Sequence, residues 1–324
     1  MAASTPPPTR DPASAPAPLP GVAGLADRPV DERRVAWVMA AVAFALAAGC
    51  AAMVEALLAS ADAEPDGGRM LRDLAVPGPA PAGPPGRAAV VVVDGLRTDE
   101  AWSIEDAARA TVAVPPPTRT TPALHTLLTG VPPGASGVRS NRFAGPARHD
   151  TVADRVRAAG GRVFVVADGD DTLRALIGRP EDGGSDAAGS LGAPLDAAVD
   201  AWRRAPEPAL LLAHVLDVDR TAHAGGVGTA AHRAALAEAR EVVARVARVA
   251  RAADAALFVL GDHGHLGDGG HGGPERAVAR TPLAARAPGL APRTLDVPVP
   301  AERLASTLAT WLGVPRPRSA AGPP

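Results

Sequence analysis

A glycine-rich stretch near the C-terminus, LGDHGHLGDGGHGG, brings three histidines and two aspartates into one short loop. Asp262 and His263 are adjacent, and His271 follows eight residues later. Glycine permits sharp backbone reversals, so we expect the loop to fold back until His271 joins a metal site that begins on a neighbouring strand. His265 and Asp268 are expected to be solvated loop residues.

Two further aspartates stand where apolar runs stop. Asp94 ends AAVVVVD, and Asp219 ends ALLLAHVLDVD, with His223 four residues later. A lone aspartate in such a place is usually a turn former or a helix cap. Together with Asp262, however, these carboxylates would meet at one edge of a parallel sheet, where ligands bind. A donor set of Asp and His favours zinc or manganese, and the single cysteine, Cys50, excludes a cysteine-based zinc site.

The segment PPTRTTPALHTLLTG predicts the start of a helix that carries hydroxyl groups. Thr120 and Thr121 precede Pro122, which is tolerated in a first helical turn. The simplest interpretation is an N-cap threonine. A helix N-terminus also attracts phosphate through its free N–H groups and its dipole, and a threonine hydroxyl beside a metal can attack phosphorus. Asn141, in SGVRSNRF, would on its own be a turn residue.

The elements that must position these side chains alternate along the chain. Continuous apolar runs predict buried strands at 88–95, 162–169, 209–219 and 255–264. Helix-like segments lie between or beside them at 121–130, 151–161, 194–205 and 229–253. This alternation predicts an α/β fold with a mainly parallel central sheet flanked by helices.

An uncharged apolar run predicts one transmembrane helix over residues 35–57, before the α/β part. Val35–Val54 is long enough to cross about 30 Å of hydrocarbon, and we expect an uncleaved signal anchor. SADA at 60–63 resembles a cleavage site, and LAAGC, ending at Cys50, resembles a lipoprotein box. The slight excess of arginine before the run favours a cytoplasmic N-terminus and an extracytoplasmic C-terminal part.

The remaining segments and the overall charge complete the expected organisation. Residues 1–34 are rich in Pro and Ala and are expected to be disordered, residues 58–87 form a Pro/Gly-rich linker, and residues 319–324 form a disordered tail. We expect residues 88–318 to form the catalytic domain. The formal net charge of −2 gives no support for nucleic-acid binding, and no obligate protein partner is evident.

Five motifs in order resemble those of the alkaline phosphatase superfamily: VVVDGLRTD, TTPALHTLLTG, SNRF, HVLDVDRTAH and GDHGHLGDGGHGG. The branches that are most similar are the type I phosphodiesterase/nucleotide pyrophosphatase group and the related GPI ethanolamine-phosphate transferases. The resemblance runs from about Ala88 to Pro315. It implies an alkaline phosphatase-like fold for the globular part.

Residue by residue, the resemblance implies two metal sites, one formed by Asp94, Thr120, Asp262 and His263 and the other by Asp219, His223 and His271. It also implies that Thr120 is the nucleophile and that the amide of Asn141 holds a phosphate oxygen. Two positions depart from the family, since Ala222 replaces a glycine and His265 replaces a methionine. Sulfatases need Cys or Ser at the nucleophile and Arg four residues later, whereas this chain has Thr120 and Leu124.

The activity that the resemblance implies is that of a membrane-anchored phosphodiesterase or phosphotransferase-type hydrolase acting through a phospho-threonine. Two divalent ions, about 3.5–4 Å apart, are expected, with zinc first and manganese as the alternative. The substrate would be a small phosphate ester or a lipid headgroup. A phosphomonoesterase on the same scaffold and an inactive, membrane-tethered binding protein are the alternatives.

Overall fold

The computed structural model divides the chain into two compact units, residues 1–55 and 56–324, and each is described by itself. The structure describes residues 31–61, 86–101, 103–143, 145–169, 172–178 and 191–320. Most of the N-terminal segment, most of the linker and the last four residues, for which disorder or extended linker structure was expected, lie outside these ranges.

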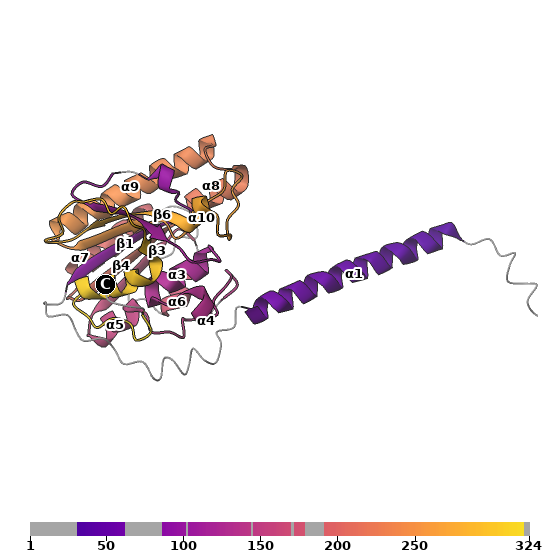
Figure 1. Cartoon of the computed structure of the whole chain (residues 1–324), viewed down its shortest axis with the longest axis horizontal. Coiled ribbons are helices and arrows are strands. Elements are labelled where there is room, and N and C mark those ends of the chain that lie inside the picture. The colour runs from indigo at the N-terminus through magenta and orange to yellow at the C-terminus, as the bar shows by residue number, and fades with distance from the viewer. Residues whose placement is uncertain are drawn as a thin grey trace, which may run out of the picture. The chain divides into compact units, whose positions relative to one another are not determined.

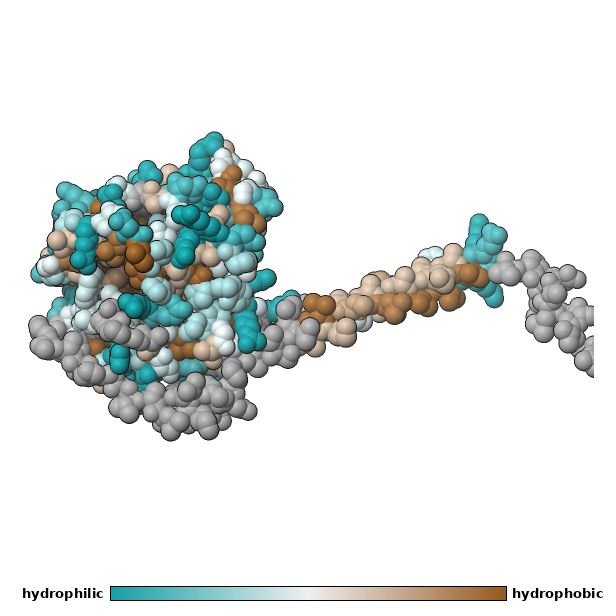
Figure 2. All heavy atoms as spheres, viewed as in Figure 1, coloured by the Kyte–Doolittle hydropathy of each residue, from teal (hydrophilic) through white to brown (hydrophobic). Residues whose placement is uncertain are grey.

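The N-terminal apolar helix is confirmed as α1, Glu32–Ala61. Every described side chain in it from Glu32 to Val54 is exposed, and the mean hydropathy of that stretch reaches 2.1. Figure 2 shows apolar residues along its length and polar residues at its N-terminal end. The helix is longer than the predicted 35–57, so residues 58–61 are helical rather than part of the linker. Its length and composition suit a membrane anchor or a signal sequence.

A mainly parallel sheet forms the centre of the second unit, as predicted (Figure 1). Its strands, in the spatial order β3-β4-β1-β5-β6-β2-β7, are β1 Arg87–Val93, β2 Ala108–Ala113, β3 Arg162–Ala167, β4 Ala209–Val215, β5 Ala256–Leu260, β6 Arg280–Arg286 and β7 Val299–Pro300. The first four in this order are parallel to one another, and β6 is antiparallel to both β5 and β2. β1, β3, β4 and β5 were predicted, whereas β2, β6 and β7 were not.

Helices cover both faces of the sheet (Figure 1). They are α3 Thr120–Thr129, α4 Pro133–Ser136, α5 Val152–Ala158, α6 Thr172–Ile177, α7 Gly192–Arg204, α8 Asp217–Gly225, α9 Ala230–Ala252, α10 Arg276–Ala279 and α11 Leu304–Trp311, with 3-10 turns η1 Thr98–Glu100 and η2 Ala301–Arg303. In β1, Val90 and Val92 join the core with α3, α5 and α11, whereas Val91 and Val93 join the core with α7 and α9. Burial on both faces explains the continuous apolar sequence of this strand.

One predicted strand is shorter than expected, and a helix takes its place. The run 209–219 was interpreted as a strand up to Asp219, but β4 ends at Val215 and α8 begins at Asp217. Asp168 causes the change of direction, because its carboxylate accepts the backbone N–H of Leu216 at 2.9 and 3.1 Å. Asp219 therefore lies in the first turn of α8, where acidic side chains are favoured.

Candidate functional site

Four predicted residues meet at the carboxyl edge of the sheet. Asp94 follows β1, Asp262 and His263 follow β5, and Thr120 begins α3. The His263 Nε2 atom lies 3.3 Å from Asp94 Oδ1, 3.4 Å from Asp262 Oδ2 and 3.4 Å from Thr120 Oγ1. All four side chains are buried. This set corresponds to the first predicted metal site, and we call it the Asp94 cluster.

The other three predicted ligands form a second group, the Asp219 cluster. Asp219 and His223 are four residues apart on one face of α8, with 3.5 Å between Oδ1 and Nε2. His271 reaches the same carboxylate from the glycine-rich loop, at 3.6 Å, and its Nε2 lies 3.0 Å from that of His223. The rings of His263 and His271 stack with their centroids 4.0 Å apart, so the two clusters adjoin.

Two histidines belong to the site although the sequence did not assign them to it. His265 was expected to be solvated, but it is fully buried and its Nε2 lies 2.8 Å from Asp219 Oδ1. His214, inside β4, is also fully buried, with its Nε2 3.1 Å from Asp94 Oδ2. The signal for His214 was a polar ring within an otherwise apolar strand. Asp268 is exposed, as expected.

The side-chain chemistry of the clusters fits divalent metal ions. The Nδ1 atoms of His263 and His271 lie 3.3 and 3.0 Å from the carbonyl oxygens of Gly264 and Thr118. A carbonyl oxygen only accepts, so each Nδ1 carries the hydrogen, and each Nε2 presents its lone pair to the cluster, the orientation typical of metal-binding histidine. Three sets of ligand atoms lie within 4.8 Å of one another: Asp219, His223 and His265; Asp219, His263 and His271; and Asp94, His214 and Asp262.

Burial keeps the two central imidazoles in the neutral form that a metal requires. It lowers the pKa of His263 to about 3 and that of His271 to about 4. Burial also raises the pKa of Asp262. For Asp219, burial acts in the same upward direction, but the hydrogen bond with His265 and the nearby histidines outweigh it and lower the pKa. The Asp219 carboxylate is therefore poised to bind a cation.

The N-terminus of α3 presents Thr120 beside these clusters. Asn141 accepts the backbone N–H of Thr121 through Oδ1 at 2.9 Å, so its amide is held against the first turn of the helix. Pro122 has no N–H, and the N–H of Ala123 bonds to Arg119 O. Among the described residues, the Thr120 N–H and the Asn141 Nδ2 group have no hydrogen-bond partner.

Thr118, two residues before Thr120, holds the glycine-rich loop through hydrogen bonds. Its hydroxyl donates to the carbonyl oxygen of Gly273 at 2.7 Å and accepts the N–H of Gly272 at 3.2 Å. Its own carbonyl oxygen is the partner of His271 Nδ1. The segment that carries Thr120 is therefore bonded directly to the loop that carries His271.

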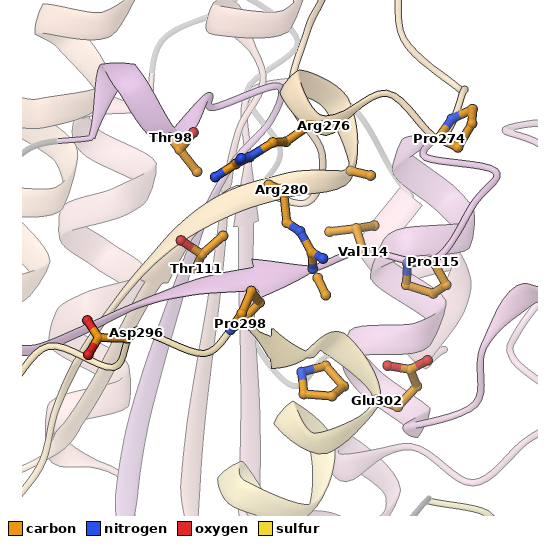
Figure 3. Close-up of a pocket in the computed structure, with 13 residues that line it drawn as sticks. Thr98, Thr111, Val114, Pro115, Pro274, Arg276, Arg280, Asp296, Pro298 and Glu302 are labelled. Carbon is orange, nitrogen blue, oxygen red and sulfur yellow. The ribbon is translucent and has the colours of Figure 1, made fainter.

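A pocket of about 830 Å³ extends from the segments that hold the site (Figure 3). Val114 and Pro115, just before Thr118, contribute to its wall, as does Pro274, just after Gly273. Figure 3 shows Arg276 and Arg280 among its labelled side chains. Neither arginine has an ion-pair or hydrogen-bond partner among the described residues. The carboxylates of Asp296 and Glu302 also line the pocket, so its charged side chains are of both signs.

No family model matches the sequence, and no curated protein sequence matches it. Solved structures do match the fold. A mutant of alkaline phosphatase PafA has a TM-score of 0.59 at 11% identity, over 75% of this chain and 99% of that chain. The murine ectonucleotide pyrophosphatase/phosphodiesterase 5 has a TM-score of 0.55 at 13% identity, over 73% of this chain and 96% of that chain.

A third similar structure is the C-terminal periplasmic domain of the phosphoethanolamine transferase EptC from Campylobacter jejuni. Its TM-score is 0.53 at 10% identity, over 72% of this chain and 91% of that chain. At these identities the likeness establishes the fold. The second unit of this chain has the fold of the alkaline phosphatase superfamily, a scaffold that carries phosphate-ester and sulfate-ester hydrolases and transferases.

Proposed function

We propose that this protein is a metal-dependent phosphoryl-transfer enzyme, a phosphodiesterase or phosphotransferase-type hydrolase. The observation that carries the proposal is the Thr120 hydroxyl, at a helix N-terminus and 3.4 Å from His263, beside two adjoining groups of carboxylates and imidazoles. The fold is shared with proteins named as a phosphatase, a phosphodiesterase and a phosphoethanolamine transferase, which supports phosphate-ester chemistry.

The proposed metal ligands are those of the two clusters. They are Asp94, Thr120, Asp262 and His263 for one ion and Asp219, His223 and His271 for the other, with zinc favoured by the imidazole donors. When bound, such ions neutralise phosphate charge and lower the pKa of a hydroxyl group.

The chain's own residues supply the nucleophile and its surroundings. The Thr120 hydroxyl loses its proton to solvent, and Oγ1 forms a bond to phosphorus while the bond to the leaving group breaks. The departing oxygen takes the electron pair and then a proton from solvent, which leaves a phospho-threonine. The Thr120 N–H and the Asn141 Nδ2 group donate hydrogen bonds to the phosphoryl oxygens. The hydrogen bond from the Thr121 N–H holds the amide of Asn141 in place for this task. Water, or an alcohol in a transferase, then releases the phosphoryl group.

The pocket beyond Pro274 is the proposed place for an anionic leaving group. Arg276 and Arg280 present two guanidinium groups there, which suit a phosphate or a carboxylate. Replacing both with Ala is expected to raise the KM for a diester whose leaving group carries a carboxylate, with little change for bis-p-nitrophenyl phosphate. An equal KM change for the two substrates would mean that the pocket does not bind the leaving group.

A phosphomonoesterase is the second candidate, because the fold is also that of alkaline phosphatase PafA. The full chain, purified in detergent, separates the candidates when it is assayed on bis-p-nitrophenyl phosphate, on p-nitrophenyl phosphate and on a phosphoethanolamine headgroup ester. We expect stoichiometric zinc by elemental analysis and faster turnover of a diester than of the monoester. A folded protein without stoichiometric metal that turns over none of the three would instead be a binding protein.

The proposed location follows from α1. We propose that α1 remains as a single-pass membrane anchor and that the catalytic unit, residues 88–318, is extracytoplasmic. The uncharged apolar stretch and the arginines that precede it support this arrangement.

A further inference from the structure

His265 lies in a space that the fold has left for its ring. The side chain is fully buried, and Arg97 donates to its backbone carbonyl oxygen at 2.9 Å, which fixes the start of the loop. Gly95, with φ +73°, is the neighbour on the β1 side. A Cβ atom there would lie 2.6 Å from both Cδ2 and Nε2 of His265, so any larger residue would displace the ring.

The hydrogen bonds of His265 define which nitrogen carries a hydrogen. Its Nδ1 lies 2.8 Å from the carbonyl oxygen of Gly269, which can only accept, so Nδ1 is the donor. In a neutral ring the Nε2 atom then has a lone pair. That atom lies 2.8 Å from Asp219 Oδ1, which is also an acceptor. Two acceptors at this distance need a cation between or beside them, either a proton or a metal ion.

The surroundings of Asp219 favour the metal ion. The same Oδ1 atom has His223 at 3.5 Å and His271 at 3.6 Å, and the rings of both lie 5.1 Å from that of His265. The ligand atoms of Asp219, His223 and His265 all lie within 4.8 Å of one another. His265 therefore directs its Nε2 atom at the same Asp219 oxygen as the other two histidines, from a ring that stands nearly perpendicular to both of theirs.

We propose that His265 is a third histidine ligand at the Asp219 site, which would then offer one carboxylate and three imidazoles. This inference rests on the proposed two-metal function and makes it more specific. Four such donors match the usual coordination number of zinc, and zinc can expand to five-coordinate when a substrate oxygen binds, so the ion still reaches the phosphate. The additional nitrogen also selects for zinc over manganese, which prefers oxygen donors.

The affinity test uses the full chain in detergent. Zinc is titrated in competition with a chromophoric chelator for the wild type, His265→Met and His265→Gln. We expect one of the two zinc sites to lose at least about 10-fold in affinity in both variants, as metal sites do when their ligand environment is broken, while the other site keeps its affinity. The matched control is His232→Gln, since His232 is equally buried but bonds to Glu100 outside the clusters.

A measurement on the wild type covers the case in which the variants fail to fold. The chain is labelled with ¹⁵N-histidine and loaded with ¹¹³Cd, and histidine nitrogens with a direct cadmium coupling are counted. Four coupled Nε2 atoms, from His223, His263, His265 and His271, are expected. Three, with His265 uncoupled, would mean that His265 only passes a proton to Asp219. A wild type that binds no stoichiometric metal would instead contradict the proposed function itself.

Discussion

At the scale of single residues, hydrogen bonding separates the roles of three neighbouring threonines. Thr118 bonds to the glycine-rich loop, and the N–H of Thr121 is held by Asn141. Only the hydroxyl of Thr120 faces an imidazole nitrogen of the metal clusters. The sequence suggested Thr120 from its distance to Pro122 and from the family resemblance. The structure adds a physical reason for the choice.

Thr120→Ala removes the proposed nucleophile while leaving the proposed carboxylate and imidazole ligands in place. We expect kcat to fall on the order of 10³-fold or more, with the far-UV circular dichroism unchanged and the zinc at the Asp219 cluster retained. Thr121→Ala is the matched control and should lose far less. Turnover is measured on bis-p-nitrophenyl phosphate with metal content determined on the same samples. Near wild-type activity of fully loaded Thr120→Ala would assign the attack to water.

Thr118 has contacts that a local sequence pattern does not reveal. In the structure its hydroxyl is buried and forms two hydrogen bonds to the backbone of the loop that carries His271. These partners are about 150 residues away in sequence, so no local pattern could reveal them.

At the scale of elements, the predicted strands can be identified from their own sequences, whereas the missed strands depend on partners far away in the chain. β1, β3, β4 and β5 are buried on both faces, so their apolar sequences are recognisable without knowledge of their partners. β6, RTPLAAR, contains a proline and alternates between buried and half-buried residues, and its two antiparallel partners lie far away in the sequence. A local sequence pattern therefore does not identify β6 as a strand.

Dependence on distant residues also explains the two wrong predictions at the site, for α8 and for His265. α8 was interpreted as the end of a strand because the helix start depends on Asp168, which belongs to β3 and its following turn. His265 was interpreted as solvated because its burial depends on the absence of a side chain at Gly95, about 170 residues earlier. The proposed ligands Asp94, Asp219 and Asp262 were recognisable because the carboxyl ends of parallel strands bring their segments together.

A substitution at Asp168 tests how α8 is positioned. Asp168→Ala removes the acceptor of the Leu216 N–H, and we expect a loss of about 1–3 kcal/mol in the free energy of unfolding together with weaker zinc binding at the Asp219 cluster. Asp168→Asn keeps an acceptor oxygen and should retain most of both. Urea unfolding and zinc competition measure the two effects. Equal losses in the two variants would show that the negative charge, rather than the acceptor, positions α8.

At the scale of the whole molecule, the chain combines an apolar helix with a unit that has the alkaline phosphatase superfamily fold. We predict that trypsin added to intact spheroplasts digests the unit at residues 88–318, because the arginine excess before α1 favours a cytoplasmic N-terminus. A cytoplasmic marker protein should survive in the same sample. Protection of the unit until the cells are lysed would reverse the topology, and a mature N-terminus beyond Ala61 would replace the anchor with a cleaved signal.

The central claim is that phosphoryl transfer proceeds through Thr120, and the stereochemistry at phosphorus tests it most directly. A covalent intermediate divides the reaction into two in-line displacements, each of which inverts the configuration. We predict net retention when a phosphate ester made chiral with oxygen isotopes is turned over by the metal-loaded full chain, whether or not the intermediate accumulates. Net inversion would mean a single attack by water or alcohol, and it would contradict the assignment of Thr120 as the nucleophile.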